Sequence, residues 1–481
     1  MPPKKREAGT DGAKKPKAKR QKKKKDEFDE SESESDNEQH NGNGASAIVE
    51  DTEPPIDITL EAPMLNGELL ICGMMNWDLS GRKALPKGMK SKGGPNLWKP
   101  NRISGFTDVK IRSVISGCVS SHSVVIDTDG KAYTFGRNEK GQLGLGHTNR
   151  VDIPTVVDCL SECKVISAAC GRNHTLFLTD KGVVYSCGDN KMGQLGIGSQ
   201  SEKVVSPQRI SYRGPPVRAL ACGGEFSMIA DIRGNLYSFG CPEYGQLGHN
   251  TDGKYFVSSN KLAFKTELTP RKVQVWIEKN RDGHIQPVTD VEVREMACGV
   301  NHTIVIDSQK RMFSWGFGGY GRLGHAENKD EMVPRLIKVF EGPNKGAALC
   351  AAGSSSSFAY TEYGALMLWG QTKPTGEANM YPKHVMDLSG WRIRSIGCAN
   401  RSVVVAADES VIAWGCSPTF GELGLGETPK SSTTPVESKP LDGIHVHSVS
   451  CGFSHTLMIA RVDTDEEREK VNKLPLYNPP A

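Results

Sequence analysis

Three histidines share one repeated sequence context and are the first candidates for proton-transfer chemistry. His174, His302 and His455 each stand three residues after the glycine of a Cys-Gly-x-x-His-Thr motif. Histidine titrates near neutral pH, which suits a general acid or base. The corresponding residues in three other copies of the motif are Phe226, Ser356 and Ser402. A catalytic histidine would not be scattered in this way, so we interpret these residues as structural pins of a turn between strands and predict no catalytic residue.

Residues 316–321 (Gly-Phe-Gly-Gly-Tyr-Gly) match the glycine pattern of dinucleotide-binding loops. Such a loop needs a following helix whose N-terminus faces the pyrophosphate group. Here a Gly-x-Leu-Gly motif and then Pro334 follow, so we predict no dinucleotide site. The P-loop pattern G-x-x-x-x-G-K-[ST] is absent, so the chain is not itself a P-loop GTPase.

The 13 cysteines show no pattern that is typical of a metal site. Cys159 and Cys163 lack the second pair of cysteines or histidines that a zinc site would need. We therefore expect no metal and no other cofactor, and we expect reduced thiols in an intracellular protein. Five further cysteines fall at one position of a repeat, where a small buried side chain fits; they are Cys170, Cys222, Cys298, Cys398 and Cys451.

Two short motifs recur seven times along the chain, and they recur in the same phase. One is an aromatic residue or Cys, then Gly, a polar loop and Gly-Gln-Leu-Gly or a close variant. The other is the Cys-Gly-x-x-His-Thr motif, with three full and four degenerate copies. Two independent motifs in one phase indicate a repeat architecture. The copies of the first motif end at residues 141–144, 193–196, 245–248, 321–324 and 421–424, with weaker copies at 72–73 and 369–370.

Each repeat has the composition of a four-stranded antiparallel sheet. Residues 165–210 contain four short apolar or β-branched runs, and residues 180–182 join the second and third as a hairpin turn would. Four short strands in about 52 residues form one propeller blade. We therefore predict an all-β, seven-bladed β-propeller over residues 67–461, followed by a short charged C-terminal tail at 462–481. A strand at 68–72 should complete the last blade, so that the two chain ends close the ring without an exposed edge.

The seven copies of both motifs resemble the repeats of the regulator of chromosome condensation family, whose members form seven-bladed propellers. Residues 76–79, 241–249 and 315–325 resemble one mitotic branch of that family most closely. The resemblance implies chromatin association and binding of Ras-superfamily GTPases, with guanine-nucleotide exchange on Ran in the founding member. For the mitotic branch it implies Rac- or Ral-type GTPases and microtubule or centromere components as partners. It also implies a location in the nucleus and nucleolus in interphase, and on chromosomes, centromere, spindle and midzone in mitosis.

Two functions remain open after this resemblance. The chain is either a regulator of small GTPases in mitosis and the cell cycle, through exchange or sequestration, or a non-exchanging scaffold on chromatin and mitotic structures. An exchange factor performs no covalent catalysis and acts by binding the nucleotide-free state more tightly than the loaded one, so no residue pattern separates the two. No run of about 18 apolar residues and no secretory signal is present. We therefore expect no membrane association, and we expect a monomer.

Residues 1–66 are divided into a basic and an acidic block. Residues 1–25 hold 12 Lys or Arg and two acids, whereas residues 26–66 hold 13 acids and no Lys or Arg. Such blocks cannot offset the entropy of ordering, so we expect disorder. The basic block is either a nuclear-import or nucleic-acid-binding element or a tail that only increases solubility. Its candidate residues are Lys14, Lys15, Lys17, Lys19, Arg20, Lys22, Lys23, Lys24 and Lys25.

Three serines of the acidic block are candidate phosphorylation sites. Ser31, Ser33 and Ser35 each have an acidic residue three positions later, which is typical of acidophilic kinase sites. Phosphate there would add negative charge that shields the basic block.

The repeat spacing is interrupted once. The first glycines at 136, 188 and 240 are 52 residues apart, but the next one is at 316. The additional residues include an alternating run at 273–277, a turn at 280–283 and a return at 284–286, which together predict a projecting β-hairpin. We interpret it as a GTPase-contacting element, by analogy with a projecting wedge in the founding family member, or otherwise as a loop without function. Its candidate contact residues are Lys279, Asn280, Arg281, Asp282, Gly283, His284, Ile285 and Gln286.

Overall fold

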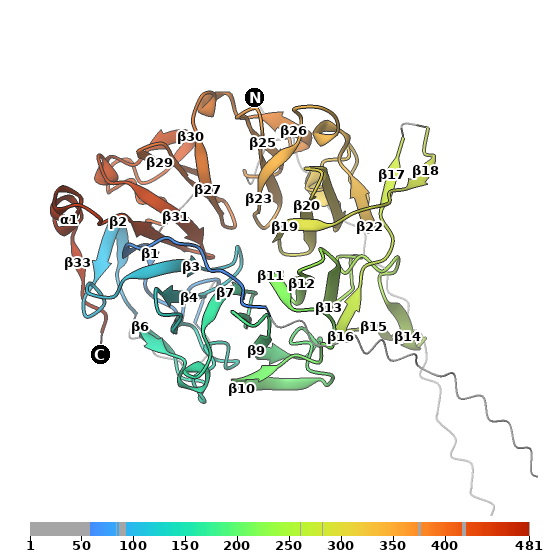
Figure 1. The fold of residues 1–481 in the computed structure, drawn as a ribbon, viewed down its shortest axis with the longest axis horizontal. Coiled ribbons are helices and arrows are strands. Elements are labelled where there is room, and N and C mark those ends of the chain that lie inside the picture. The colour runs from blue at the N-terminus through green and yellow to red at the C-terminus, as the bar shows by residue number, and fades with distance from the viewer. Residues whose placement is uncertain are drawn as a thin grey trace, which may run out of the picture. The chain divides into compact units, whose positions relative to one another are not determined.

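The computed structural model is a ring of seven antiparallel sheets, each built on four strands, as the repeats predict (Figure 1). It describes residues 58–82, 84–85, 93–259, 261–280, 282–373, 377–415 and 420–480. We call the sheets blades and number them from the one that contains strand β1. In these residues no helix has the length and apolar character needed to cross a membrane.

The strands of the seven blades have the following bounds. Blade 1 consists of β31 (Val446–Cys451), β32 (His455–Ala460), β1 (Glu68–Met74) and β2 (Asn96–Ile103). Blade 2 consists of β3 (Ile111–Ile115), β4 (His122–Asp127), β5 (Ala132–Gly136) and β6 (Val151–Val156), and blade 3 of β7 (Val165–Cys170), β8 (His174–Thr179), β9 (Val184–Asn190) and β10 (Ser201–Arg209). Blade 4 consists of β11 (Val217–Cys222), β12 (Phe226–Asp231), β13 (Leu236–Gly240) and β16 (Glu267–Lys272).

The remaining elements complete the ring and its additions. Blade 5 consists of β19 (Val293–Cys298), β20 (His302–Asp307), β21 (Met312–Gly316) and β22 (Glu331–Leu336), and blade 6 of β23 (Ala347–Ala352), β24 (Ser356–Thr361), β25 (Leu366–Gly370) and β26 (Asn379–His384). Blade 7 consists of β27 (Ile393–Cys398), β28 (Ser402–Ala407), β29 (Ser410–Gly415) and β30 (Ser432–Glu437). The additions are hairpins β14 (Lys254–Ser258) with β15 (Lys261–Phe264) and β17 (Ile277–Lys279) with β18 (Ile285–Pro287), helix α1 (Asp465–Asn472) and β33 (Leu476–Tyr477). Short 3-10 turns lie at Asp158–Leu160, Gly319–Gly321, Lys338–Phe340, Met386–Leu388 and Lys439–Leu441.

The glycine of the aromatic-Gly motif ends the third strand in a conformation that favours glycine. Gly188 has a φ of +111°, and a Cβ there would lie 2.3 Å from the carbonyl oxygen of Asn173. Gly136 and Gly240 have φ values of +112° and +109° and face the same backbone region of their own blades. A side chain at this position would force the second and third strands apart, which explains why the repeats share this glycine.

Strands from both ends of the chain close the ring in blade 1. Strand β1 pairs antiparallel with β32, with Glu68 opposite Ala460 and Gly73 opposite His455. On its other edge β1 pairs with β2, and all seven of its side chains are buried. The prediction that the chain ends share one blade is confirmed, and neither edge of β1 is free.

Residues 462–481, expected as a short charged tail, contain a helix and a strand. Helix α1 begins with a capping box in which the Thr464 hydroxyl accepts a hydrogen bond from the N–H of Glu467, and the Glu467 carboxylate accepts one from the N–H of Thr464 (both 3.2 Å). Strand β33 then pairs in parallel with β2 and buries Tyr477. This segment is therefore part of blade 1. Most of its charged residues lie on helix α1. In the sequence they outnumber Val471 and Tyr477, the apolar residues whose burial anchors the segment to the blade.

The folded region begins before residue 67. The N–H of Leu60 donates to the carbonyl oxygen of Asp180 (2.7 Å), and Lys181 Nζ donates to the Thr59 hydroxyl (2.8 Å). Leu60 and Ala62 also pack against the core shared by blades 3 and 4. The expectation of disorder over 1–66 is therefore wrong for residues 59–62. The candidate residues of the basic block and the three serines lie outside the described residues.

The interruption of the repeat spacing contains two hairpins, although the sequence predicted only one. Hairpin β14–β15 precedes β16, the outer strand of blade 4, and its two strands pair only with each other. Hairpin β17–β18 follows β16, and β17 adds to the outer edge of blade 5 through a parallel bridge between Ile277 and Arg335. Both additions lie on the outer side of the ring at blades 4 and 5 (Figure 1).

Candidate interaction surfaces

The tip of hairpin β17–β18 carries most of the residues that the sequence singled out. The Asn280 side-chain oxygen accepts hydrogen bonds from the backbone N–H groups of Asp282 (3.1 Å) and His284 (2.9 Å). Gly283 supplies the φ of +85° that the turn needs. Asp282, Gly283 and His284 are exposed, and Arg281 lies outside the described residues. The predicted turn is present, and it directs backbone and polar side-chain groups to solvent.

Lys279 differs from the tip residues because it belongs to an ion-pair network at the base of the hairpin. Its Nζ lies 3.9 Å from Glu327 Oε1, which also accepts a hydrogen bond from Arg335 (2.6 Å). On the same strand, Glu278 pairs with Lys338. Arg335 foremost, and Lys279 to a lesser degree, hold the pKa of Glu327 below its usual value. The charge of Lys279 is thus partly compensated within the chain.

The run at 273–277 is not the alternating strand that the sequence suggested. Val273 and Trp276 are both buried, and only Val275 between them is a large exposed apolar residue. The Trp276 indole packs edge-on against Phe313 (ring centroids 5.1 Å apart) and Trp315 (6.0 Å). This packing takes the side chain into the core between blades 4 and 5, so the chain becomes extended strand only from Ile277 onward.

Hairpin β14–β15, which sequence reasoning missed, exposes large apolar side chains to solvent. Phe256 is 73% exposed, and Tyr255, Val257 and Leu262 are exposed as well. On hairpin β17–β18, Ile285 is 61% exposed, and its neighbour Gln286 also faces solvent. Clustered exposed apolar residues are typical of protein contact sites. We define the four apolar residues of hairpin β14–β15, Tyr255, Phe256, Val257 and Leu262, as the rim patch.

The surroundings of the rim patch are positively charged. Residues 252–272 contain five Lys or Arg and two acids. The two acids are already paired within this segment, Asp252 with Lys254 (3.1 Å) and Glu267 with Arg271 (2.6 Å). The remaining lysines therefore leave the segment with a net positive charge, which favours an acidic partner surface.

Four buried histidines link neighbouring blades. In each, the ring Nε2 lies within hydrogen-bond distance of a hydroxyl on the second strand of the next blade. In three of the four pairs that hydroxyl in turn donates to a carbonyl oxygen of a Gly-Gln-Leu-Gly or Gly-Arg-Leu-Gly loop, as Thr175 does to Gln142 (2.7 Å). The pairs are His122 with Thr175 (2.8 Å), His174 with Ser227 (3.0 Å), His302 with Ser357 (2.9 Å) and His455 with Ser123 (2.7 Å). The two repeat motifs therefore meet across three of these blade interfaces. The rings of the histidines link neighbouring blades, whereas the sequence predicted that they pin a turn between strands.

Burial makes these histidines poor acids and bases at neutral pH. It lowers the pKa of His122 and His455 to about 3 and that of His174 to about 4. The pKa of His302 is also lowered well below its usual value by burial, and further by Arg322. The rings are neutral and enclosed, so they are suited to hydrogen bonding rather than to proton transfer.

Seven cysteines, one from each blade, line a narrow cavity of about 220 Å³ at the centre of the ring. The sequence identified five of them and missed Cys118 and Cys350, which are displaced from the shared repeat position. The Sγ atom of Cys222 lies 3.6 Å from the carbonyl oxygen of Ala169 in the preceding blade. Burial raises the pKa of all seven thiols, which keeps them neutral. Among the described residues, no group of three or more His, Cys, Asp or Glu is arranged to hold a metal ion.

The glycine-rich loop at 316–321 serves packing within blade 5. A Cβ at Gly318 would lie 1.8 Å from the carbonyl oxygen of Lys329. The loop leads through a single 3-10 turn to strand β22, so it lacks the helix N-terminus that a pyrophosphate group requires. Buried Arg322 instead stacks over Phe317, 4.5 Å from the ring centroid.

The seven blades and the motif contacts between them define a propeller of the RCC1-like class. Residues 99–458 match the family model described as the RCC1-like domain, and the chain belongs to this family. Human Protein RCC2 is 55% identical over 438 residues, which cover 90% of this chain and 84% of that protein. The zebrafish Protein RCC2 homolog is 55% identical over 425 residues, 88% of this chain and 86% of that protein. The sequence resemblance to one branch of the family is thereby confirmed.

Solved structures show the same fold at lower identity. Human WBSCR16 superimposes with a TM-score of 0.65 at 21% identity, covering 83% of this chain and all of that one (100%). Prp20p from Saccharomyces cerevisiae superimposes with a TM-score of 0.64 at 19% identity, covering 86% of this chain and 95% of that one. At these identities the likeness concerns the fold alone.

Proposed function

We propose that this protein regulates small GTPases of the Ran, Rac or Ral type on chromatin, and that the GTPase docks on the rim patch. Family membership supports this proposal, because the resemblance to the family implies regulation of small GTPases. The structural study of yeast Prp20p describes its binding to Gsp1p and histones, which supports the same two classes of partner here.

The observation that carries the proposal is the rim patch itself. Hairpins β14–β15 and β17–β18 lie on either side of β16 in the chain, and among the residues that the structure describes no other interval between repeats has two such additions. Their exposed apolar side chains would gain free energy by leaving water, at about 25 cal/mol per Å² buried. The uncompensated lysines nearby would steer an acidic GTPase surface into register.

Regulation at this patch needs no covalent chemistry. A partner that binds the nucleotide-free GTPase more tightly than the loaded form shifts the equilibrium toward release of GDP. A partner that binds both forms equally well shifts nothing and acts only by sequestration. Exchange and sequestration therefore differ in one measurable quantity, the affinity of this protein for the nucleotide-free GTPase relative to the loaded GTPase.

The test measures release of fluorescent GDP from Ran, Rac and Ral, with and without the full chain. Phe256→Ser combined with Leu262→Ser should weaken GTPase binding by about tenfold or more, because both side chains lose buried apolar area. Met386→Ser is the matched control, since Met386 is an exposed apolar residue (70%) at the start of another short turn, far along the chain in blade 6. Faster release at catalytic amounts of protein supports exchange, and stoichiometric binding without faster release supports a scaffold that sequesters. Binding that is equal in the double variant and the wild type would remove the rim patch from the proposal.

We extend the proposal to the cell cycle on the basis of the branch to which the chain is similar. The protein would act in mitosis at chromosomes, centromere and spindle, and would reside in the nucleus and nucleolus in interphase. The lysine-rich block would direct this location through import or through phosphate contacts. Phosphorylation at Ser31, Ser33 or Ser35 would weaken those contacts.

A further inference from the structure

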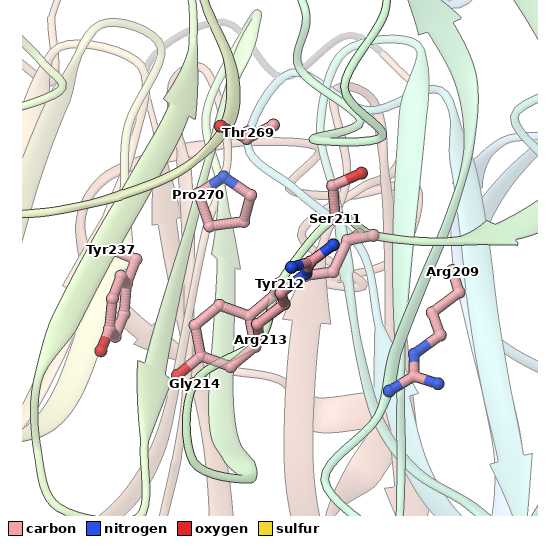
Figure 2. A pocket seen from close by; sticks show the side chains of 9 residues that line it. Arg209, Ser211, Tyr212, Arg213, Gly214, Tyr237, Thr269 and Pro270 are labelled. Carbon is pink, nitrogen blue, oxygen red and sulfur yellow. The ribbon is translucent and has the colours of Figure 1, made fainter. Parts of the chain in front are cut away.

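A cavity of about 730 Å³ lies between blades 3 and 4, and none of the rim patch residues lines it (Figure 2). One wall is the end of β10 and the segment after it, with Arg209, Tyr212 and Arg213. The opposite wall comes from β13 and β16 and includes Tyr237 and Pro270. The cavity is thus bounded by the outer strands of two neighbouring blades.

The two arginines give the cavity an uncompensated positive charge. Arg209 and Arg213 are exposed, and neither forms an ion pair with any residue that the structure describes. Elsewhere in the structure some arginines are paired, as Arg311 of blade 5 is with Asp307 (2.7 Å). The carboxylate of Asp231, behind Tyr237, is fully buried and already accepts a hydrogen bond from Asn235 (2.8 Å). It therefore does not neutralise the cavity mouth.

The floor between the arginines and Pro270 is aromatic. The Tyr212 and Tyr237 rings pack edge to face, with centroids 5.0 Å apart. Gly214 makes room for this packing, because a Cβ there would lie 2.4 Å from the Tyr212 hydroxyl. An apolar and aromatic floor beside guanidinium groups suits a ligand that has both an anionic group and an apolar part.

A segment of this chain packs against the core cluster that also contacts the two tyrosines of the cavity. Leu60 and Ala62 pack against the same core cluster as Tyr212 and Tyr237. The bond from the Leu60 N–H to the Asp180 carbonyl oxygen (2.7 Å) fixes this segment through its backbone. This surface of blade 3 therefore binds a chain segment without helix or strand structure, through one backbone bond and small apolar contacts.

We propose that the cavity binds a segment of a partner protein that carries a phosphorylated serine or threonine. The phosphate dianion would accept hydrogen bonds from the planar guanidinium groups of Arg209 and Arg213. Residues flanking the phosphate would lie on the tyrosines and Pro270. A peptide fits better than a nucleic acid, because a concave site with two arginines offers no extended row of cations for a phosphate backbone. This site is independent of the GTPase proposal.

The test uses the full chain and fluorescein-labelled nine-residue peptides with a central phosphoserine and randomised flanks, at physiological salt. Arg209→Gln and Arg213→Gln should each weaken binding by about tenfold, since each removes charge-assisted hydrogen bonds. Arg401→Gln is the matched control, because Arg401 is exposed and without an ion pair to a described residue, and lies in blade 7's motif turn. All variants retain the lysine-rich block, so differences between them report on the cavity alone.

The expected result is tight binding of the phosphorylated peptides, weak binding of their unphosphorylated counterparts, and loss only in the two cavity variants. Three results would overturn the proposal. One is equal binding by the cavity variants and the wild type. Another is inorganic phosphate that competes as well as the peptide, which would leave a simple anion site. The third is a 20-base-pair DNA duplex that binds the wild type more tightly than it binds either cavity variant, which would make the cavity a nucleic-acid site.

Discussion

The buried histidines couple the stability of the propeller to pH. Their folded pKa values, about 3 for His122 and His455 and about 4 for His174, lie below the unfolded value of about 6.5. Between these limits the unfolded chain binds more protons than the folded chain. The free energy of unfolding is therefore highest above pH 6.5. It decreases as the pH falls toward the folded-state pKa values, by up to about 1.4 kcal/mol per pH unit for each histidine.

Urea unfolding between pH 5 and pH 7 should show this slope directly. Replacing His174 with Gln should reduce the slope by about 1 kcal/mol per pH unit on average over this range, because the unfolded imidazole is only partly protonated near pH 7. The exposed Gln286, which carries no titrating group, provides the control, and Gln286→Ala should leave the slope unchanged. An equal slope in wild type and His174→Gln would contradict the assignment of a depressed pKa to His174.

A buried carboxylate produces the opposite response. Glu422 occupies the position held by Gln142, Gln194 and Gln246 in other loops, and burial raises its pKa to about 7. A raised carboxyl pKa contributes stability below the unfolded value of about 4.3, and that stability is lost as the pH rises through 7. Glu422→Gln should therefore stabilise the protein by about 1–2 kcal/mol at pH 8 and leave it unchanged at pH 4.

Comparison of denaturant midpoints at pH 4 and pH 8 tests this prediction. The Gln142 amide nitrogen is buried without a hydrogen-bond partner, so a glutamine at 422 should not recover the whole penalty of the buried charge. A Glu422→Gln variant that is less stable than the wild type at pH 8 would show that the carboxylate is held by contacts stronger than those observed.

At the scale of elements, hairpin β17–β18 separates into a structural base and a free tip. Trp276→Ala should destabilise the propeller by about 3–5 kcal/mol, because it empties a position packed against Phe313 and Trp315. Replacing residues 280–285 with a Gly/Ser turn should change stability by less than about 0.5 kcal/mol, since the tip packs against nothing in the core. Chemical denaturation of both variants measures the contrast. A tip replacement as damaging as Trp276→Ala would show that the tip is part of the fold.

The same two hairpins show which elements could be predicted from the sequence. The turn at 280–283 was predictable because Asn and Gly at fixed positions favour a tight turn. Hairpin β14–β15 was missed because its turn has no glycine and because one hairpin was enough to explain the longer spacing. Strand content at 273–277 was overestimated, since Trp276 pairs with rings from a distant repeat and no local pattern reveals that contact. The repeats predicted the ring and a structural role for the histidines, but the hydrogen bonds that these histidines make to the next blade and the additions to the repeats were not predicted or only partly so.

At the scale of the whole molecule, Thr59 and Leu60 are the first described residues that contact the propeller. Deleting residues 1–57 should leave Tm unchanged, whereas deleting 1–66 should lower stability by about 1–2 kcal/mol through loss of the Leu60 contacts. Both deletions should abolish nuclear accumulation, because both remove the lysine-rich block. Calorimetry and imaging of a fluorescent fusion measure the two effects. Full nuclear accumulation after deletion of 1–57 would assign import to the propeller instead.

The closure of blade 1 has a consequence for how the protein is made. Strand β1 lies between β2 and β32, and nearly 390 residues separate Glu68 from His455. At about 5–20 residues per second, a ribosome needs roughly 20–80 s to synthesise that interval. During this time β1 can pair with β2, but its other edge has no partner and its apolar side chains are only partly covered. A nascent chain must therefore be protected at this edge until synthesis is almost complete, and a chaperone that holds extended apolar strands would meet that need.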